Sequence, residues 1–298
     1  MNRRPRGRRH HGVADTSHRR KVNYRNLKNP LLRQPAFSDD RLEAIHDTAL
    51  RVIEELGIKV LNDTARQYFK QAGASVDEAT QMVKIDRDLV RASLDSAPGE
   101  FVIHGRTPGF DVSMGGDNIN FVSVGGAPHI SDLDHGKRPA TLEDTRNIIK
   151  LCEHFDVIHL QSPNVESQDI PVHLRHYRVT ESQLTLSQKP FFIYSRGSEQ
   201  VEDAFAMTRI AYGLSEAEFV AKPWCYTIIN TNSPRQLDVP MCQGIIDFAK
   251  AGQVSVITPF TLAGAMAPVT MPGALVLQHA EAPVSYTHLT LPTKESRW

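Results

Sequence analysis

The feature that most constrains the fold is a fivefold alternation between residues 119 and 282. Each time, an apolar run rich in β-branched residues is followed by a loop and then by an amphipathic stretch with helical spacing. This alternation is typical of a parallel sheet whose strands are joined by helices. The predicted strands are Ile119–Val124, Val157–Gln161, Phe191–Tyr194, Trp224–Ile229 and Val254–Ile257. The predicted helices cover residues 142–155, 172–187, 199–213, 239–251 and 272–282.

Polar and small residues collect in the loops that follow these strands, and those loops are longer than the loops before the strands. In a parallel barrel, the loops after the strands form the face that binds substrate. The strand ends therefore supply the candidate binding residues, namely Gly125, Gly126, His129, Ser162, Asn164, Ser195, Arg196, Asn230, Asn232, Thr258 and Thr261.

Aromatic residues on two of the strands add to this set. Alternate residues of a strand share a face, so Trp224 and Tyr226 lie on the face of Asn230, and Tyr194 lies on the face of Arg196. Aromatic faces bind cations that cannot donate a hydrogen bond. One interpretation is an aromatic wall for a cation, with Arg196, Asn230 or Asn232 holding a carboxylate. The alternative is ordinary core packing.

The segment before the alternation predicts a small α/β cap over residues 38–118. Ser38 is a suitable N-cap for a helix whose apolar positions end at Gly57. Two short helices follow, near residues 63–72 and at about 87–95. The same segment has short predicted strands at Met82–Ile85, Phe101–His104 and Phe110–Met114.

The first 28 residues form a basic arm. They hold ten of the 34 Lys and Arg residues but only one acid, Asp15, which leaves 24 basic and 33 acidic residues in the rest of the chain. The first 28 residues have Tyr24 as their only aromatic residue and show no apolar periodicity, and residues 1–37 are predicted to be a disordered, solvated arm. Binding of this arm to nucleic acid or to an anionic membrane surface is the alternative.

The sequence disfavours a membrane span, a disulfide framework and a metal site. The sequence has no run of eighteen apolar residues and no apolar stretch behind the N-terminal arginines, which predicts a cytoplasmic protein without a membrane span. Cys152, Cys225 and Cys242 are far apart, so neither a disulfide framework nor a zinc site is expected. His173 and His176 are spaced like metal ligands but lack a matching carboxylate, so no metal site is predicted.

Two segments carry a resemblance to a known family. They are Val124-Gly-Gly-Ala-Pro-His-Ile-Ser-Asp-Leu-Asp134, continued by Arg138-Pro-Ala-Thr-Leu-Glu-Asp144, and Thr261-Leu-Ala-Gly-Ala-Met-Ala-Pro-Val-Thr270, continued by Gly273-Ala-Leu-Val. Both resemble the trimethylamine methyltransferase family, and the similarity covers about residues 25–282, including the Asn230–Arg235 loop. The resemblance implies a TIM (β/α)8 barrel, of which this chain supplies about five βα units after its cap. We therefore expect an incomplete barrel that is inactive by itself.

The resemblance also implies the chemistry. Family members move a methyl group from a methylated amine or betaine to a Co(I) corrinoid carried by a partner protein, so the expected partners are a small methylated amine and a cognate corrinoid protein. No cofactor is expected to bind this chain directly, and a homo-oligomer is left open. Some members carry pyrrolysine beyond the point where this sequence stops. Two classes therefore stay open: the class with pyrrolysine, which resembles the trimethylamine enzyme, and the class without it, which resembles glycine betaine enzymes. The second class is favoured.

The motifs that the chain lacks agree with this chemistry. It has no GxSxG, HExxH, P-loop or GxGxxG motif after a strand, and a corrinoid nucleophile needs no side-chain nucleophile. Another enzyme on the same fold, such as an aldolase or a hydrolase, is the competing hypothesis, because a fold does not determine its chemistry. A lysine at a strand end would favour the aldolase hypothesis, but none of the predicted strands ends in a lysine.

The last sixteen residues differ in character from the rest. Pro283 is expected to interrupt the preceding helix, and the Thr-rich string that follows resembles translated sequencing-adapter sequence. We therefore expect residues 283–298 to be an artefact and exclude them from the predicted fold.

Overall fold

The structure is a computed structural model that describes residues 24–31 and 34–295. Most of the predicted basic arm lies outside the described residues. At the end of the arm, Leu27–Lys28 forms strand β1, which pairs antiparallel with β7, Asn118–Ile119. The predicted disorder is thus wrong for this short piece, because its backbone is held by a strand partner.

The N-terminal part contains both helices and strands. Its helices and strands are α1 Asp39–Arg51, β2 Ile58–Val60, α2 Asp63–Gln71, β3 Ser75–Asp77, β4 Met82–Lys84 and α3 Arg87–Asp95, with a π-helical turn at Val52–Leu56 after α1. At its end, Gly57 has φ +71°, and a Cβ there would lie 2.5 Å from the Val83 carbonyl oxygen. Only glycine permits this turn without strain.

This unit shares its sheet and its core with the second half of the chain. Strand β12, Gln236–Leu237, pairs parallel with β2, so the sheet order is β12-β2-β4-β3. Leu50, Ile53 and Phe69 of the cap share one core cluster with Ile229 and Ile245. Burial of these apolar side chains stabilises the cap against the rest of the molecule.

A parallel sheet of three strands forms the centre of the second part. Its strands are β10 Phe191–Phe192, β11 Cys225–Thr231 and β13 Val254–Pro259, in the order β10-β11-β13. Isolated parallel bridges between Gln161 and Phe191 and between Val122 and Leu160 continue this pairing toward earlier segments. The mixed α/β class is confirmed, and the described residues form no closed barrel.

The first two predicted strands of the alternation, Ile119–Val124 and Val157–Gln161, form no ladder with each other and are joined only by the bridge between Val122 and Leu160. The Phe121 carbonyl accepts hydrogen bonds from the backbone N–H groups of both His159 and Leu160, at 2.9 and 3.3 Å. The Phe121 N–H in turn donates to Nδ1 of His159 at 3.0 Å. A side chain therefore takes a hydrogen bond that a regular ladder would give to backbone, and only single bridges remain.

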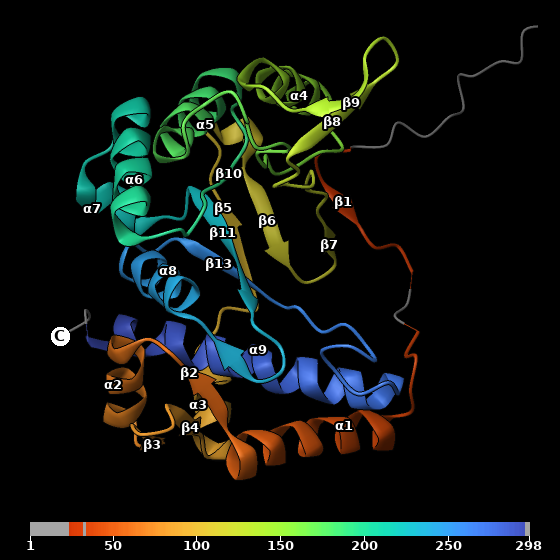
Figure 1. Ribbon diagram of the computed structural model, residues 1–298, viewed down its shortest axis with the longest axis vertical. Coiled ribbons are helices and arrows are strands. Elements are labelled where there is room, and N and C mark those ends of the chain that lie inside the picture. Colours follow the sequence, from red (N-terminus) through yellow and green to blue (C-terminus); the bar gives the residue numbers. More distant parts are fainter. Residues whose placement is uncertain (1–23, 32–33, 296–298) are drawn as a thin grey trace, which may run out of the picture.

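Helices lie on several sides of the central strands in Figure 1, although not on the side of β1 and β7. Four of the five predicted helices are confirmed to within one residue at each end, as α4 Leu142–His154, α5 Val172–Leu186, α6 Ser198–Tyr212 and α8 Val239–Lys250. Helix α7, Glu216–Ala221, was not predicted. It begins with a capping box, in which Ser215 and Glu218 each accept a backbone N–H from the other.

The last helix is longer than predicted. Helix α9 runs over Met271–Glu295 and passes through Pro283, where an interruption was expected. A proline removes one helical hydrogen bond but does not end the helix here. Ala280 and Glu281 are fully buried, and α9 packs against α1, α2, α3 and α8. The assignment of residues 283–298 as an artefact stays a prediction.

Two antiparallel hairpins flank the central strands. Strands β5 Glu100–Ile103 and β6 Val112–Gly115 pair with each other, and their side chains Ile103 and Val112 pack against the parallel sheet. Strands β8 His129–Asp132 and β9 Gly136–Pro139 form a second hairpin within what the sequence predicted to be a loop. Figure 1 shows this hairpin projecting from the molecule beside α4.

Candidate functional site

A cavity of about 490 Å³ lies where the parallel segments end. It is lined by Val122, Ser123, Val124, Gly125, Gly126, Ser162, Phe192, Tyr194, Ser195, Arg196, Ile228, Asn230 and Met241. A volume of this size suits a small-molecule ligand. Because parallel strands run in one direction, their carboxyl ends bring loops from distant parts of the chain to the same place.

The inner face of the sheet is apolar at one end and polar at the other. Phe192 and Tyr226 pack with Leu160 and with Ile103 and Val112 of the β5–β6 hairpin, which closes the amino end of the strands. Further along β11, the same face carries Ile228 and then Asn230, which both line the cavity. The cavity therefore has a packed hydrophobic floor and a polar upper wall.

The structure brings together six residues of the predicted substrate-binding set. They line the cavity and are Gly125, Gly126, Ser162, Tyr194, Arg196 and Asn230. Ser195, another predicted strand-end residue, lines it too. Thr258 does not line the cavity, but its hydroxyl donates a hydrogen bond to Oδ1 of the cavity residue Asn230 at 2.6 Å.

The remaining predicted residues lie outside the cavity wall. His129 is exposed on the β8–β9 hairpin, Asn164 donates to the Ser162 carbonyl at 2.9 Å, and Thr261 donates to the Pro259 carbonyl at 3.4 Å. Asn232 and Asp238 exchange hydrogen bonds that close the loop after β11.

Trp224 and Tyr226 also lie elsewhere, at the amino end of β11. The Trp224 ring packs against Tyr212 and His104, and the Tyr226 hydroxyl donates to the Gln161 carbonyl at 3.0 Å. In the structure both residues belong to core packing, which was the alternative interpretation for each aromatic residue.

Two glycines permit close packing of the segment Val122–Gly126, which forms one wall of the cavity. A Cβ at Gly125 would lie 2.5 Å from Oγ of Ser162. Gly126 has φ +85°, and its Cβ position is 3.7 Å from the Tyr194 hydroxyl. These positions let the loop after the first strand segment lie directly over Ser162 and Tyr194.

Arg196 is held by a charged group that the sequence did not single out. Glu166 forms ion pairs with Arg196 and, at 3.6 Å, with Arg175 of α5. The Arg196 guanidinium carbon lies 4.2 Å from the centroid of the Tyr194 ring. The loop that contains Glu166, Ser162–Pro171, was predicted to lie on the active face. Nothing in the sequence pairs Glu166 with an arginine 30 residues further on.

The Tyr194 hydroxyl is buried and has no hydrogen-bond partner among the described residues. Burial raises the pKa of Tyr194 to about 12, and the nearby Glu166 carboxylate acts in the same direction. The hydroxyl is therefore protonated at neutral pH and can donate a hydrogen bond.

A second buried carboxylate shapes the loop beside Asn230. Glu281 of α9 is fully buried and accepts hydrogen bonds from the Thr231 hydroxyl, from the Ser233 hydroxyl at 2.6 Å and from the Arg235 N–H at 2.8 Å. Sequence analysis missed this residue because a single acid on a helix gives no sign of its distant partners.

Comparison with known proteins decides the family. The family model described as trimethylamine methyltransferase (MTTB) matches residues 4–296, nearly the whole chain. The chain belongs to the trimethylamine methyltransferase family. The resemblance found in the sequence is thus confirmed.

The chain spans about half the length of the curated relatives that it matches. It is 34% identical over 246 residues to a glycine betaine methyltransferase of Desulfitobacterium hafniense (strain Y51), covering 82% of this chain and 51% of that protein. It is 32% identical over 263 residues to a trimethylamine methyltransferase of Methanosarcina mazei, covering 86% of this chain and 53% of that protein.

Among solved structures, the chain is similar to MtmB in its hydroxylamine complex. The TM-score is 0.44 at 11% sequence identity, over 80% of this chain and 55% of that chain. A similarity of this size does not establish a common fold.

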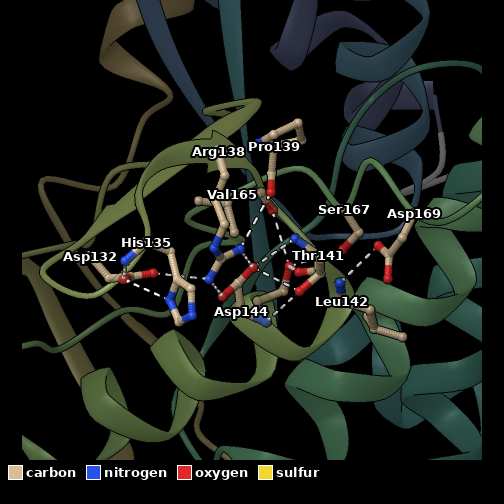
Figure 2. A network of polar contacts seen from close by, with 11 residues as sticks. Asp132, His135, Arg138, Pro139, Thr141, Leu142, Asp144, Val165, Ser167 and Asp169 are labelled. Atoms are coloured by element: carbon tan, nitrogen blue, oxygen red, sulfur yellow. Dashed lines mark hydrogen bonds and ion pairs between the residues drawn. The ribbon is translucent and has the colours of Figure 1, made fainter.

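The family-like segment Arg138–Asp144 has a structural role beside the cavity. Figure 2 shows Arg138 of the hairpin donating two hydrogen bonds to the Asp144 carboxylate, at 2.6 and 2.8 Å, and one to Asp132 at 3.2 Å. Asp144 also completes the predicted capping box with Thr141 at the start of α4. The Arg138 guanidinium holds the pKa of Asp144 well below its usual range. The hairpin is thereby fixed to α4.

Within the described part of this family member, no group of three or more His, Cys, Asp or Glu side chains is arranged to hold a metal ion. The three cysteines are free. His176 contacts Asp203 of α6 at 3.3 Å. Among the described helices, none is both long and apolar enough to cross a membrane.

Proposed function

We propose that this protein takes part in methyl transfer from a methylated amine or betaine to the Co(I) corrinoid of a partner protein. The observation that carries the proposal is the family match over nearly the whole chain. The names of the matched relatives, glycine betaine methyltransferase and trimethylamine methyltransferase, support the two substrate classes. Nothing in these names favours an aldolase or a hydrolase.

The fold proposed for this activity is a (β/α)8 barrel, of which residues 119–282 supply about five units and residues 38–118 a cap. The support is the order of parallel contacts, in which each segment pairs with the next one along the chain: 122 with 160, 161 with 191, β10 with β11 and β11 with β13. Neighbouring strands that follow chain order are the arrangement of such a barrel.

In this proposal, the cavity binds the methylated substrate. When its partner protein brings it to the cavity, the Co(I) corrinoid supplies the nucleophile. A cavity of about 490 Å³ suits the small amine, while the corrinoid stays on its own protein. This chain then has to bind, orient and desolvate the substrate, for which it needs no nucleophilic side chain.

The residues proposed for substrate binding are those that line the cavity. Tyr194 offers an aromatic face, while Arg196 and the exposed side-chain amide of Asn230 are hydrogen-bond donors for a carboxylate. Oδ1 of Asn230 already accepts from Thr258, which leaves the Nδ2 group to face a ligand.

The test is a methyl-transfer assay. A full-length family member that contains this sequence is incubated with a Co(I) corrinoid protein and with glycine betaine or trimethylamine, and methyl-Co(III) is followed by its absorbance spectrum. Formation of methyl-Co(III) that requires both the protein and the substrate is the expected result. Failure with every methylated amine, while a known family member is active with the same corrinoid protein, would refute the proposal.

A further inference from the structure

One carboxylate and two arginines meet beside the aromatic wall of the cavity. The Glu166 side chain is only 18% exposed and pairs with both Arg196 and Arg175, whereas the Arg196 side chain is 48% exposed. Arg196 is thereby held with its guanidinium over the Tyr194 ring. One face of this ring is thus already occupied by a cation that belongs to the protein.

Tyr194 is the aromatic residue of the cavity best placed for a ligand. Phe192 packs edge-on against it, with ring centroids 4.7 Å apart and an interplanar angle of 89°, and Phe192 is 92% buried in the floor of the cavity. A methylated ammonium group prefers an aromatic face. Such a ligand therefore competes with Arg196 for the Tyr194 ring and meets a like charge there.

We propose that Arg196 is the specificity-determining residue: lying over the Tyr194 ring and paired with Glu166, it makes the cavity prefer a zwitterion over a simple methylated cation. The zwitterion carries both a methylated ammonium group and a carboxylate. This inference rests on the proposed function, because it concerns the substrate class of the same cavity.

The two ligand classes face different costs. A simple cation must displace Arg196 from the ring or share the ring with it. Such a cation has no negatively charged group that could pair with the arginine. A zwitterion exchanges partners, since its ammonium group takes the ring and its carboxylate pairs with Arg196, for which a guanidinium is well suited. Glu166 keeps Arg175 as its partner, so no buried charge is left alone.

The test compares two ligands of similar shape. Dissociation constants of glycine betaine and of ethyltrimethylammonium, which lacks the carboxylate, are measured by calorimetry for the unaltered protein and for Glu166→Gln and Arg196→Gln. The matched control is Glu181→Gln, which removes the same charge from an exposed ion pair with Arg178 on α5.

The two cavity variants are expected to act in opposite directions. Glu166→Gln frees Arg196 for the ligand carboxylate, so the preference for glycine betaine rises about fivefold, the effect of one partly exposed ion pair. Arg196→Gln removes the carboxylate partner and clears the ring, so glycine betaine loses its advantage over ethyltrimethylammonium. Glu181→Gln leaves the preference unchanged.

The outcomes separate this inference from the proposed function. Binding of both ligands with the same preference in all four proteins would overturn the inference and leave the proposed function in place. Absence of binding of either ligand to the unaltered protein would overturn both. If Glu166→Gln does not fold, Arg196→Gln decides alone, because in that variant Glu166 still pairs with Arg175.

Discussion

Lys189 shows how a single buried side chain secures the end of an element. It is fully buried, and its ammonium group donates to the carbonyls of Cys152 and Phe155, at 2.6 and 2.9 Å, at the end of α4. Replacing Lys189 with Met removes both of these charged hydrogen bonds, so we expect a loss of about 2 kcal/mol in the free energy of unfolding. Urea denaturation measures it.

The control for Lys189 is Lys150→Met on α4, the helix whose last carbonyls Lys189 binds. Lys150 is 53% exposed and its contact with Glu143 is 3.9 Å long, so its replacement is expected to change stability by less than about 0.5 kcal/mol. Equal stability losses in the two variants would show that the buried hydrogen bonds of Lys189 contribute nothing specific.

Single residues of the site were predictable where position along a strand decides their place. Tyr194, Arg196 and Asn230 follow from strand alternation, since alternate residues point to one face and the strand ends are known from the helices that come next. The partners of these residues were not predictable. The ion pair of Glu166 with Arg196 and the hydrogen bonds of Glu281 depend on how distant segments meet, which no local pattern records.

At the scale of elements, the ion pair between Arg138 and Asp144 links the β8–β9 hairpin to α4. Asp144 accepts two hydrogen bonds from Arg138 and caps α4 through Thr141, and its side chain is 13% exposed. Asp144→Asn is therefore expected to cost about 2 kcal/mol at pH 6, combining a cap and a charged hydrogen bond. The matched control is Glu143→Gln, whose side chain is 64% exposed in the same helical turn.

The pH dependence of this cost has a definite sign. The pKa of Asp144 is lowered in the folded state, chiefly by its hydrogen bonds with Arg138, so its stabilising contribution is complete above the ordinary pKa of 3.8. It is lost as pH falls below that value toward the folded pKa. The difference between the unaltered protein and Asp144→Asn should therefore shrink between pH 5 and pH 2 in denaturation experiments. A difference that stays constant over this range would contradict the assignment.

Elements differed in how far the sequence determined them. Helices α4, α5, α6 and α8 were predicted closely because each has an amphipathic period, and in α4 the capping pair Thr141 and Asp144 marks the first residue. The strand Ile119–Val124 was predicted from its apolar residues alone. Its pairing depends on where His159 places its ring, which a run of β-branched residues does not reveal.

At the scale of the whole molecule, the sheet ends in two edges with apolar side chains. Val122 and Val124 on the first segment are 43% and 79% exposed, and all residues of β13 at the other edge are only half-buried. Among the described residues, β13 pairs only with β11. Unpaired, apolar strand edges favour association with other chains.

We therefore expect the chain to self-associate as its concentration rises, which sedimentation velocity would detect as a growing share of large species. Val124→Lys places a charge on one edge and should reduce this association, because charged edge residues oppose strand pairing. Val172→Lys, at a position 68% exposed on the surface of α5, introduces the same charge away from either edge and should have little effect. If the unaltered chain sediments as a monomer at every concentration and unfolds in one cooperative transition, these edges do not act as association sites, and the proposal of an open barrel loses its physical support.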